Sequence, residues 1–380
     1  MKTLSTTLLV AISLTFAQSF FNMNGLGEPA YSATGRSAAL GNPVALSSGN
    51  PGNFIHLSQT SLEMTLLGIG TIGQQSALTR AIANIRPATV YGAVPLPTRT
   101  RILLGIDEIF NQEFDVWSES LSDTLPRHHI QSRGGIYALN AGIAQSFLSH
   151  ICLGLLIRPY LGGVRENWSY ITPEGTIATD TIAIDYAAFT TRLGAALQFN
   201  PVTVAVSYDP PLNLSARRLK LIHGVIRESR RTYQIKLPSI LNLGAAIGPI
   251  WKIDHFALGL EMRPWNKATI DNNTAEYLST LRPSFGIEYE LLPDHPLRLG
   301  YSMNTWYCLN SATHKPIKEN SFHLGIGIPI PKFGNIDIGS EIFIRTSPTA
   351  SGVLKETSAR LMFTLAYKET WAKRTRRWGY

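Results

Sequence analysis

From about residue 61 onward, apolar residues alternate with polar or small residues in blocks of about ten. In one such block, Phe285, Ile287 and Tyr289 alternate with Gly286 and Glu288. A period of two predicts strands that have one apolar face and one polar face. We count about fourteen such strands, over residues 61–72, 86–96, 101–110, 135–147, 151–161, 187–199, 202–208, 231–248, 254–263, 282–291, 296–306, 320–330, 334–345 and 356–368.

The connections between these strands alternate in length. The short ones cover residues 97–100, 148–150, 200–201, 249–253, 292–295 and 331–333. The long, polar ones cover residues 73–85, 111–134, 162–186, 209–230, 264–281, 307–319 and 346–355. Long loops at one end and short turns at the other are typical of bacterial outer-membrane barrels, whose closed wall satisfies every backbone group in lipid.

A soluble β-sandwich also produces alternating strands. However, a sandwich has no reason to keep its long loops at one end, and these strands would leave much polar surface in its core. We therefore predict an all-β fold, an antiparallel transmembrane β-barrel of about 14 strands over residues 60–371, followed by a basic tail over residues 372–380.

The N-terminal region differs from the rest of the chain. Residues 1–17 hold one lysine, an apolar run from Leu8 to Phe16 and the small Ala17, which predicts a cleaved secretory signal peptide. Residues 18–59 are rich in Gly, Ser, Asn and Ala and do not alternate, so we expect a hatch that plugs the lumen, or a segment in the periplasm. The expected location is the bacterial outer membrane.

Composition excludes several other classes. Hydrophobic residues make up 44% of the chain and the net charge is +8, which excludes intrinsic disorder. After the N-terminus no stretch approaches the roughly 20 apolar residues of a spanning helix, so a helical transporter is excluded. Two cysteines exclude a disulfide scaffold, and we expect Cys152 and Cys308 to lie on opposite sides of the membrane, too far apart to pair.

Three stretches carry a resemblance to a known family: YSATGRSAALGNPVALSSGNPGN (31–53), LPSILNLGAAIGPIWKIDHFALGLEM (237–262) and HPLRLGYSMN (295–304). They resemble the FadL-type outer-membrane transporters of hydrophobic compounds and the related PorV-like barrels. Asn50, Pro51 and Gly52 are similar to the family's Asn-Pro-Ala hatch motif, with Gly in place of Ala. The resemblance implies fourteen strands, an N-terminal hatch in the lumen and passage of hydrophobic molecules.

Charged residues on the polar face are candidates for the lumen. A tight turn at 292–295 would place Glu290 across from Arg298, and Glu341 would face Arg360; we interpret both as pairs that hold the register. Arg158 and Arg263 lie near the long-loop ends of their strands without an obvious cross-strand acid. They are ligand candidates that could receive an anionic head group, or they are solvated lumen charges.

Residues 107–123 place Phe110, Phe114, Trp117 and Leu121 at helical spacing. This spacing predicts a short amphipathic helix that either docks an apolar ligand or packs on the barrel rim. A second loop carries a cationic patch that would suit lipopolysaccharide phosphates and outer-membrane lipids, and we do not expect a nucleic-acid partner. Its basic residues are Arg217, Arg218, Lys220, Arg227, Arg230 and Arg231.

We expect no enzyme, no metal and no cofactor, because His128 and His129 lack further metal ligands at a suitable spacing and no G-x-S-x-G motif occurs. By resemblance, the predicted function is passive uptake of hydrophobic small molecules such as long-chain fatty acids, with movement of the hatch. The alternative is a PorV-like barrel that binds a protein partner through its loops, in secretion or in the envelope. An opening in the wall beside Gly92 would favour transport.

Overall fold

The computed structural model describes residues 19–369 except 24, 32–33, 56, 76–77, 118–126, 148–149, 173–174, 224, 251–252, 310–314, 332 and 350–351. The predicted signal peptide and basic tail therefore lie outside the described residues. No helix among the described residues has the length and apolar character needed to cross a bilayer.

The described strands form one closed antiparallel barrel of fourteen wall strands, as the alternation predicted. Strand β2 pairs with β20 from Thr60–Glu369 to Gln75–Leu354, which closes the wall. Three wall strands are interrupted, so that each consists of two segments. The wall strands are β2 (Thr60–Gln75), β3 (Leu78–Pro95), β4 (Thr100–Asn111) with β5 (Phe114–Trp117), β6 (Arg127–Phe147), β7 (Ile151–Thr172), β8 (Gly175–Phe199), β9 (Val202–Asp209) with β10 (Leu212–Ile222), β11 (Val225–Leu237) with β12 (Ile240–Ile247), β13 (Ile253–Arg263), β16 (Thr280–Leu292), β17 (His295–Leu309), β18 (Pro316–Ile330), β19 (Gly334–Thr349) and β20 (Gly352–Glu369).

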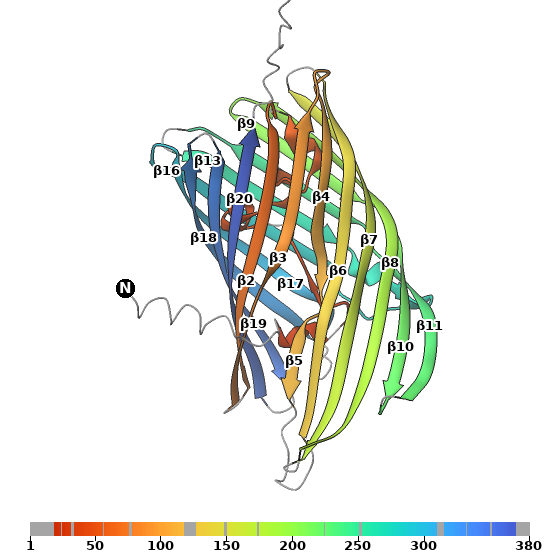
Figure 1. Cartoon of the computed structure of the whole chain (residues 1–380). Coiled ribbons are helices and arrows are strands. Elements are labelled where there is room, and N and C mark those ends of the chain that lie inside the picture. Colours follow the sequence, from red (N-terminus) through yellow and green to blue (C-terminus); the bar gives the residue numbers. More distant parts are fainter. Residues whose placement is uncertain are drawn as a thin grey trace, which may run out of the picture.

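The two ends of the barrel differ, as Figure 1 shows. The short turns after β3, β8, β16 and β18 lie at one end, which we call the short-turn end. We call the opposite end the long-hairpin end. Long loops were predicted there, but most of the residues in those predicted loops continue the strands. The β2–β3 ladder runs to Gln75–Leu78, and the β7–β8 ladder runs to Thr172–Gly175.

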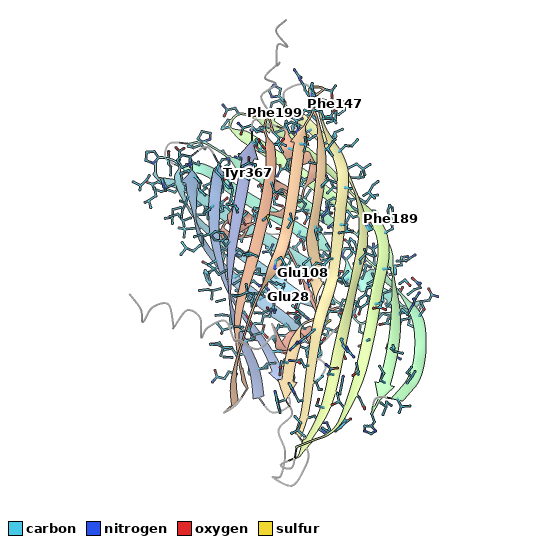
Figure 2. All side chains as sticks on the ribbon, in the orientation of Figure 1. Glu28, Glu108, Phe147, Phe189, Phe199 and Tyr367 are labelled. Carbon is cyan, nitrogen blue, oxygen red and sulfur yellow. The ribbon has the colours of Figure 1, made fainter. Side chains whose placement is uncertain are left out.

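Side-chain exposure is reversed relative to a soluble protein. Leu104, Phe189 and Phe322 on the outside are more than half exposed, whereas the charged side chains of Arg158 and Glu356 inside are fully buried. Figure 2 shows the labelled phenylalanines on the outside of the wall and the two labelled glutamates within it. An apolar outside and a polar inside are the arrangement of a barrel that is solvated by lipid.

Two predicted cross-strand pairs have different outcomes. Glu341 lies opposite Arg360, and their side chains are joined at 3.1 Å, as predicted. The pairing of Glu290 with Arg298 is wrong, because Glu288 occupies that position. The ladder is irregular between Glu290 and Leu292 at the turn, which shifts the register.

Smaller elements lie inside the barrel and form the plug, as the fold prediction required (Figure 1). Helix α2 contacts β17 to β20, η2 contacts β9, β12 and β13, and η3 contacts β6 to β9. The elements before the wall are η1 (Phe20–Met23), β1 (Glu28–Pro29), α2 (Gly35–Ala39), η2 (Val44–Leu46) and η3 (Pro51–Phe54). Between β13 and β16 come η4 (Trp265–Lys267), β14 (Thr269–Ile270) and β15 (Asn273–Thr274).

The plug packs directly against glycines of the wall strands. Four pairs of glycines lie directly opposite one another on neighbouring strands. A Cβ atom on any of the eight would come within 3 Å of a plug atom, so the plug rests on the backbone of the wall itself. The pairs are Gly154 with Gly194, Gly244 with Gly259, Gly286 with Gly300, and Gly325 with Gly339.

Candidate functional site

The Asn50-Pro51-Gly52 turn fixes the plug to β7 and β8. Asn50 Oδ1 accepts a hydrogen bond from Gly52 N at 2.9 Å, and Asn50 Nδ2 donates to Ala45 O at 2.7 Å. Pro51 begins η3, where a missing N–H is tolerated. A Cβ on Gly52 would lie 2.5 Å from the carbonyl carbon of Ala195, which explains why glycine stands at the third position of this hatch motif.

A buried ion cluster anchors the strand β1. Glu28 forms ion pairs with Arg345 and with Arg360, the latter at 2.6 Å, and Arg345 also contacts Glu319 at 2.6 Å and Glu356 at 3.1 Å. Burial alone would raise the pKa of Glu28, but the two guanidinium groups lower that pKa to about 2. Glu28 is therefore a charged anchor at neutral pH.

Further arginines of the wall bind backbone carbonyl groups of the plug. Arg101 donates to Ile55 O at 2.7 Å, and Arg192 donates to Gly49 O at 3.0 Å. Arg282 donates to Asn42 O at 3.1 Å. These bonds come from different sides of the barrel, so the plug is held around its circumference.

Arg158 does not lack an acidic partner, so that part of the prediction is wrong. Its guanidinium contacts Asp107 at 2.7 Å and Asp209 at 2.7 Å, and its Nε donates to Asn140 at 2.8 Å. The two aspartates lie on β4 and β9, each two strands away from Arg158 on β7. The prediction considered only acidic residues on the strands next to β7, so it could not identify Asp107 and Asp209.

Arg263 also has an acidic partner, which lies on its own strand. Its Nε contacts Glu261 Oε1 at 2.7 Å, and its guanidinium lies 5.4 Å from the ring centre of Tyr31 in the plug. Arg158 and Arg263 line one cavity of about 20 Å³, which has room for about one water molecule. The structure brings the two arginines together, but an anionic head group would need the plug to move.

The predicted helix over residues 107–123 is wrong for its described part. Residues up to Asn111 belong to β4, and β5 spans Phe114–Trp117. An irregularity between Glu108 and Phe110 in the pairing with β6, and the break after Asn111, change which face each residue occupies. Helix-like spacing of the aromatic residues results from these breaks, and Leu121 lies outside the described residues.

The three aromatic candidates of that segment have different environments. Phe110 packs edge-on against Trp265, with ring centres 5.9 Å apart, and Phe114 is buried beside the lumen cavity described next. Trp117 instead stacks on His129 at 4.0 Å, away from that cavity.

A large buried apolar cluster fills the lumen on the long-hairpin side of the plug. At its centre Trp265 stacks on Tyr307 with ring centres 4.3 Å apart, and Trp306 lies 5.7 Å from Tyr307. Phe21 and Leu26 of the plug belong to this cluster. Cys308 belongs to it as a free thiol, and Cys152 is a free thiol in a second cluster.

Beside this cluster lies a cavity of about 130 Å³, which we call the aromatic cavity. Tyrosines and aliphatic side chains form most of its wall, and no Lys or Arg is among its described lining residues. Its lining residues are Asn22, Gly25, Leu26, Gln112, Phe114, Glu166, Ile184, Tyr186, Tyr233, Ile235, Ile270 and Tyr277.

Sequence reasoning missed most of these residues. Glu166, Tyr186 and Tyr277 fall in segments that were expected to be loops, and Tyr233 lies on another strand. Each of these residues is an ordinary position in the alternating pattern of its own segment. They come together only when the strands close into a barrel. The available signal was the continued alternation of residues 162–186, which extends the β7–β8 hairpin.

The wall is interrupted between β3 and β4. Their ladder begins at Pro95–Arg101 and ends at Thr89–Asp107, so that among the described residues β3 before Thr89 pairs only with β2. Strand β1 occupies the freed edge of β4, where Ala30 N donates to Ile109 O at 2.9 Å. Gly92 lies within the intact ladder, so the opening beside Gly92 that would have favoured transport is not observed; the interruption lies farther along β3, before Thr89.

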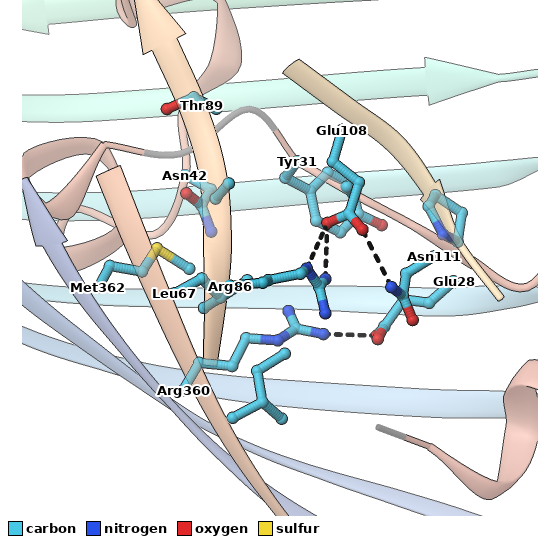
Figure 3. A pocket seen from close by; sticks show the side chains of 14 residues that line it. Glu28, Tyr31, Asn42, Leu67, Arg86, Thr89, Glu108, Asn111, Arg360 and Met362 are labelled. Atoms are coloured by element: carbon cyan, nitrogen blue, oxygen red, sulfur yellow. Dashed lines mark hydrogen bonds and ion pairs between the residues drawn. The ribbon is translucent and has the colours of Figure 1, made fainter. Parts of the chain in front are cut away.

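Charged side chains bridge this interruption, as Figure 3 shows. Arg86 of β3 contacts Glu108 of β4 at 2.6 Å, and Asn111 donates to the same carboxylate at 3.0 Å. These residues line a cavity of about 30 Å³ together with Glu28 and Tyr31 of the plug. The gap between the strands is therefore closed by side chains rather than by backbone pairing.

A fourth cavity, of about 320 Å³, lies on the short-turn side of the plug. Its lining is polar and includes Arg36, Glu63 and His255. Arg36 of the plug contacts Glu288 of β16 at 3.0 Å, which adds another anchor.

Comparison with known proteins identifies the fold. No family model matches the chain, and its sequence matches no curated protein. The structure is similar to the toluene transporter TodX of Pseudomonas putida, with a TM-score of 0.63, 13% identity and coverage of 90% of this chain and 99% of that chain. The chain has the fold of the FadL-type transporters.

Two further structures support this assignment of the fold. The toluene transporter TbuX of Ralstonia pickettii has a TM-score of 0.64 at 11% identity, over 89% of this chain and 99% of that chain. A FadL homologue of Pseudomonas aeruginosa has a TM-score of 0.58 at 11% identity, over 93% of this chain and 99% of that chain. The FadL-type fold therefore extends over nearly all of this chain.

Proposed function

We propose that the chain is a passive outer-membrane channel for small hydrophobic molecules about the size of one aromatic ring. The observation that carries the proposal is the aromatic cavity inside the barrel, next to the buried apolar cluster. The FadL-type fold and the apolar outer surface support a location in the outer membrane.

The size of the cavity favours a small ligand over a long-chain fatty acid. Apolar protein cavities of about 150 Å³ bind benzene, whereas drug-sized ligands use pockets of roughly 300–1,000 Å³. The aromatic cavity, at about 130 Å³, is close in volume to the first of these, and its lining also includes the polar side chains of Gln112 and Glu166. Two proteins of the same fold are described as toluene transporters, which agrees with a ligand of this size.

The proposed path leads from the aromatic cavity to the interrupted wall. Leu26 and Gln112 line the aromatic cavity, and their near neighbours in sequence, Glu28 and Asn111, line the cavity at the β3–β4 interruption. Passage straight through the lumen is obstructed by a plug that is bonded on several sides. We therefore propose lateral exit between β3 and β4, after the contact of Arg86 with Glu108 opens.

Calorimetric titration of the purified barrel in detergent with toluene tests this function. Wild-type protein should bind toluene saturably, and Ile235→Trp should abolish binding, because Ile235 is a buried residue of the cavity wall. Leu299→Trp is the matched control, since Leu299 is half exposed on the outside. Absence of saturable binding to the wild type, or equal loss in both variants, would refute the proposal and leave the protein-partner alternative.

A further inference from the structure

The polar groups of the aromatic cavity fall into two sets. In the first set, the Tyr186 hydroxyl is hydrogen-bonded to Gln112 and to Tyr233, so these side chains satisfy one another. A ligand gains little from groups that already have partners, because a new hydrogen bond would have to replace an existing one.

The second set consists of acceptors with unused hydrogen-bonding capacity. Asn22 donates through Nδ2 to Asn111 Oδ1 at 3.2 Å and to Glu113 O at 2.9 Å, which fixes the orientation of its amide. Its Oδ1 is buried and has no hydrogen-bond donor among the described residues. An unsatisfied buried carbonyl is energetically unfavourable, so such an atom is rare without a reason.

Glu166 presents a second acceptor to the same cavity. In the described part of the chain it has one hydrogen-bond donor, Trp168 Nε1 at 3.3 Å, and no ion-pair partner. Its carboxylate can accept several hydrogen bonds. Ser132, opposite Glu166 on β6, has a buried hydroxyl that also has no partner among the described residues.

We propose that the ligand of the aromatic cavity is a monocyclic aromatic compound that carries a hydrogen-bond donor, and that the donor binds Glu166 and Asn22 Oδ1. The proposal rests on the function proposed above and specifies its substrate class. A plain hydrocarbon would offer no donor to either acceptor, whereas a donor on the ring would bind them while the ring packs among Tyr186, Tyr233 and Tyr277.

The donor chemistry fits a hydroxyl group or an ammonium group. Either group donates to a carboxylate, and the absence of Lys and Arg from the described lining removes a competing cation. Tyrosine rings also attract cations, which would favour an aryl-alkyl ammonium ion. Phenol therefore serves as the probe for a hydroxyl donor, and benzylamine serves as the probe for an ammonium donor.

The first test is a calorimetric titration of the purified full-length barrel with phenol, benzylamine, anisole and toluene. Anisole has the ring and oxygen of phenol but no donor. We expect phenol or benzylamine to bind about tenfold more tightly than anisole and toluene, the effect of one hydrogen bond to a charged acceptor. Equal affinity for phenol, benzylamine, anisole and toluene would overturn the donor inference while leaving the aromatic channel intact.

Variants of Glu166 test whether this side chain causes the preference for ligands that carry a donor. Glu166→Gln should weaken phenol binding several-fold, and Glu166→Leu should remove most of the preference for phenol over anisole. Glu290→Gln is the control, because Glu290 is exposed near the short-turn end. An undiminished preference for phenol in Glu166→Leu would overturn the assignment. Failure of all four probes to bind the wild type would overturn it together with the proposed function.

Discussion

Substitution of Gly52 by alanine should loosen the plug, even though alanine restores the more familiar form of the hatch motif. The new Cβ would lie 2.5 Å from the carbonyl carbon of Ala195 and 2.6 Å from its Cα and N. Backbone atoms of a paired wall strand cannot rotate away, so the plug must move by about 1 Å to restore ordinary contact. That movement weakens the bonds of Asn50 to Gly52 N and to Ala45 O, which are 2.9 Å and 2.7 Å long.

The expected cost is about 1–3 kcal/mol, from overpacking and weakened hydrogen bonds. Hydrogen exchange of the plug amides in detergent measures this loss of plug stability directly. Gly70→Ala is the matched control, because no atom lies within 4 Å of a Cβ at Gly70. Amide protection in residues 35–55 should fall in Gly52→Ala and stay unchanged in Gly70→Ala. Equal protection in the two variants would refute the account of how the plug is seated.

Three further predictions concern the charged groups. Arg158→Ala should destabilise the barrel by about 3–5 kcal/mol in urea unfolding, because Asp107 and Asp209 lose a buried partner, and an unchanged midpoint would contradict this. Glu28→Gln should lower amide protection of the plug; since the pKa of Glu28 is lowered to about 2, the wild type's advantage should hold above about pH 4.5 and vanish as the pH falls through about 2. Arg86→Met should speed toluene entry into liposomes that contain the barrel, because the bridge across the wall interruption is lost, and slower entry would count against the lateral path.

The wall could be predicted from the sequence because its pattern is local. Alternation along blocks such as Phe285–Tyr289 reports which face each side chain occupies, whatever the rest of the chain does. The pair of Glu341 with Arg360 follows from the same pattern together with a symmetrical hairpin. The pair expected for Glu290 failed because one irregular turn shifts the register.

The interior could not be predicted in the same way, because its contacts cross the lumen. Arg158 meets acids two strands away on either side, and no spacing in the sequence encodes that distance. Phe110 and Phe114 were predicted to lie on a helix, but they lie in strands, where the breaks in β4 give them a helix-like spacing. The tyrosines of the aromatic cavity come from separate elements and converge only in the closed barrel.

The most direct test of the central claim is anomalous diffraction from crystals of the barrel soaked in bromobenzene, with 4-bromophenol as a second ligand. The account predicts a bromine peak inside the barrel, among Tyr186, Tyr233 and Tyr277. Bromine peaks confined to the apolar outer surface, or no peak in the lumen, would contradict it.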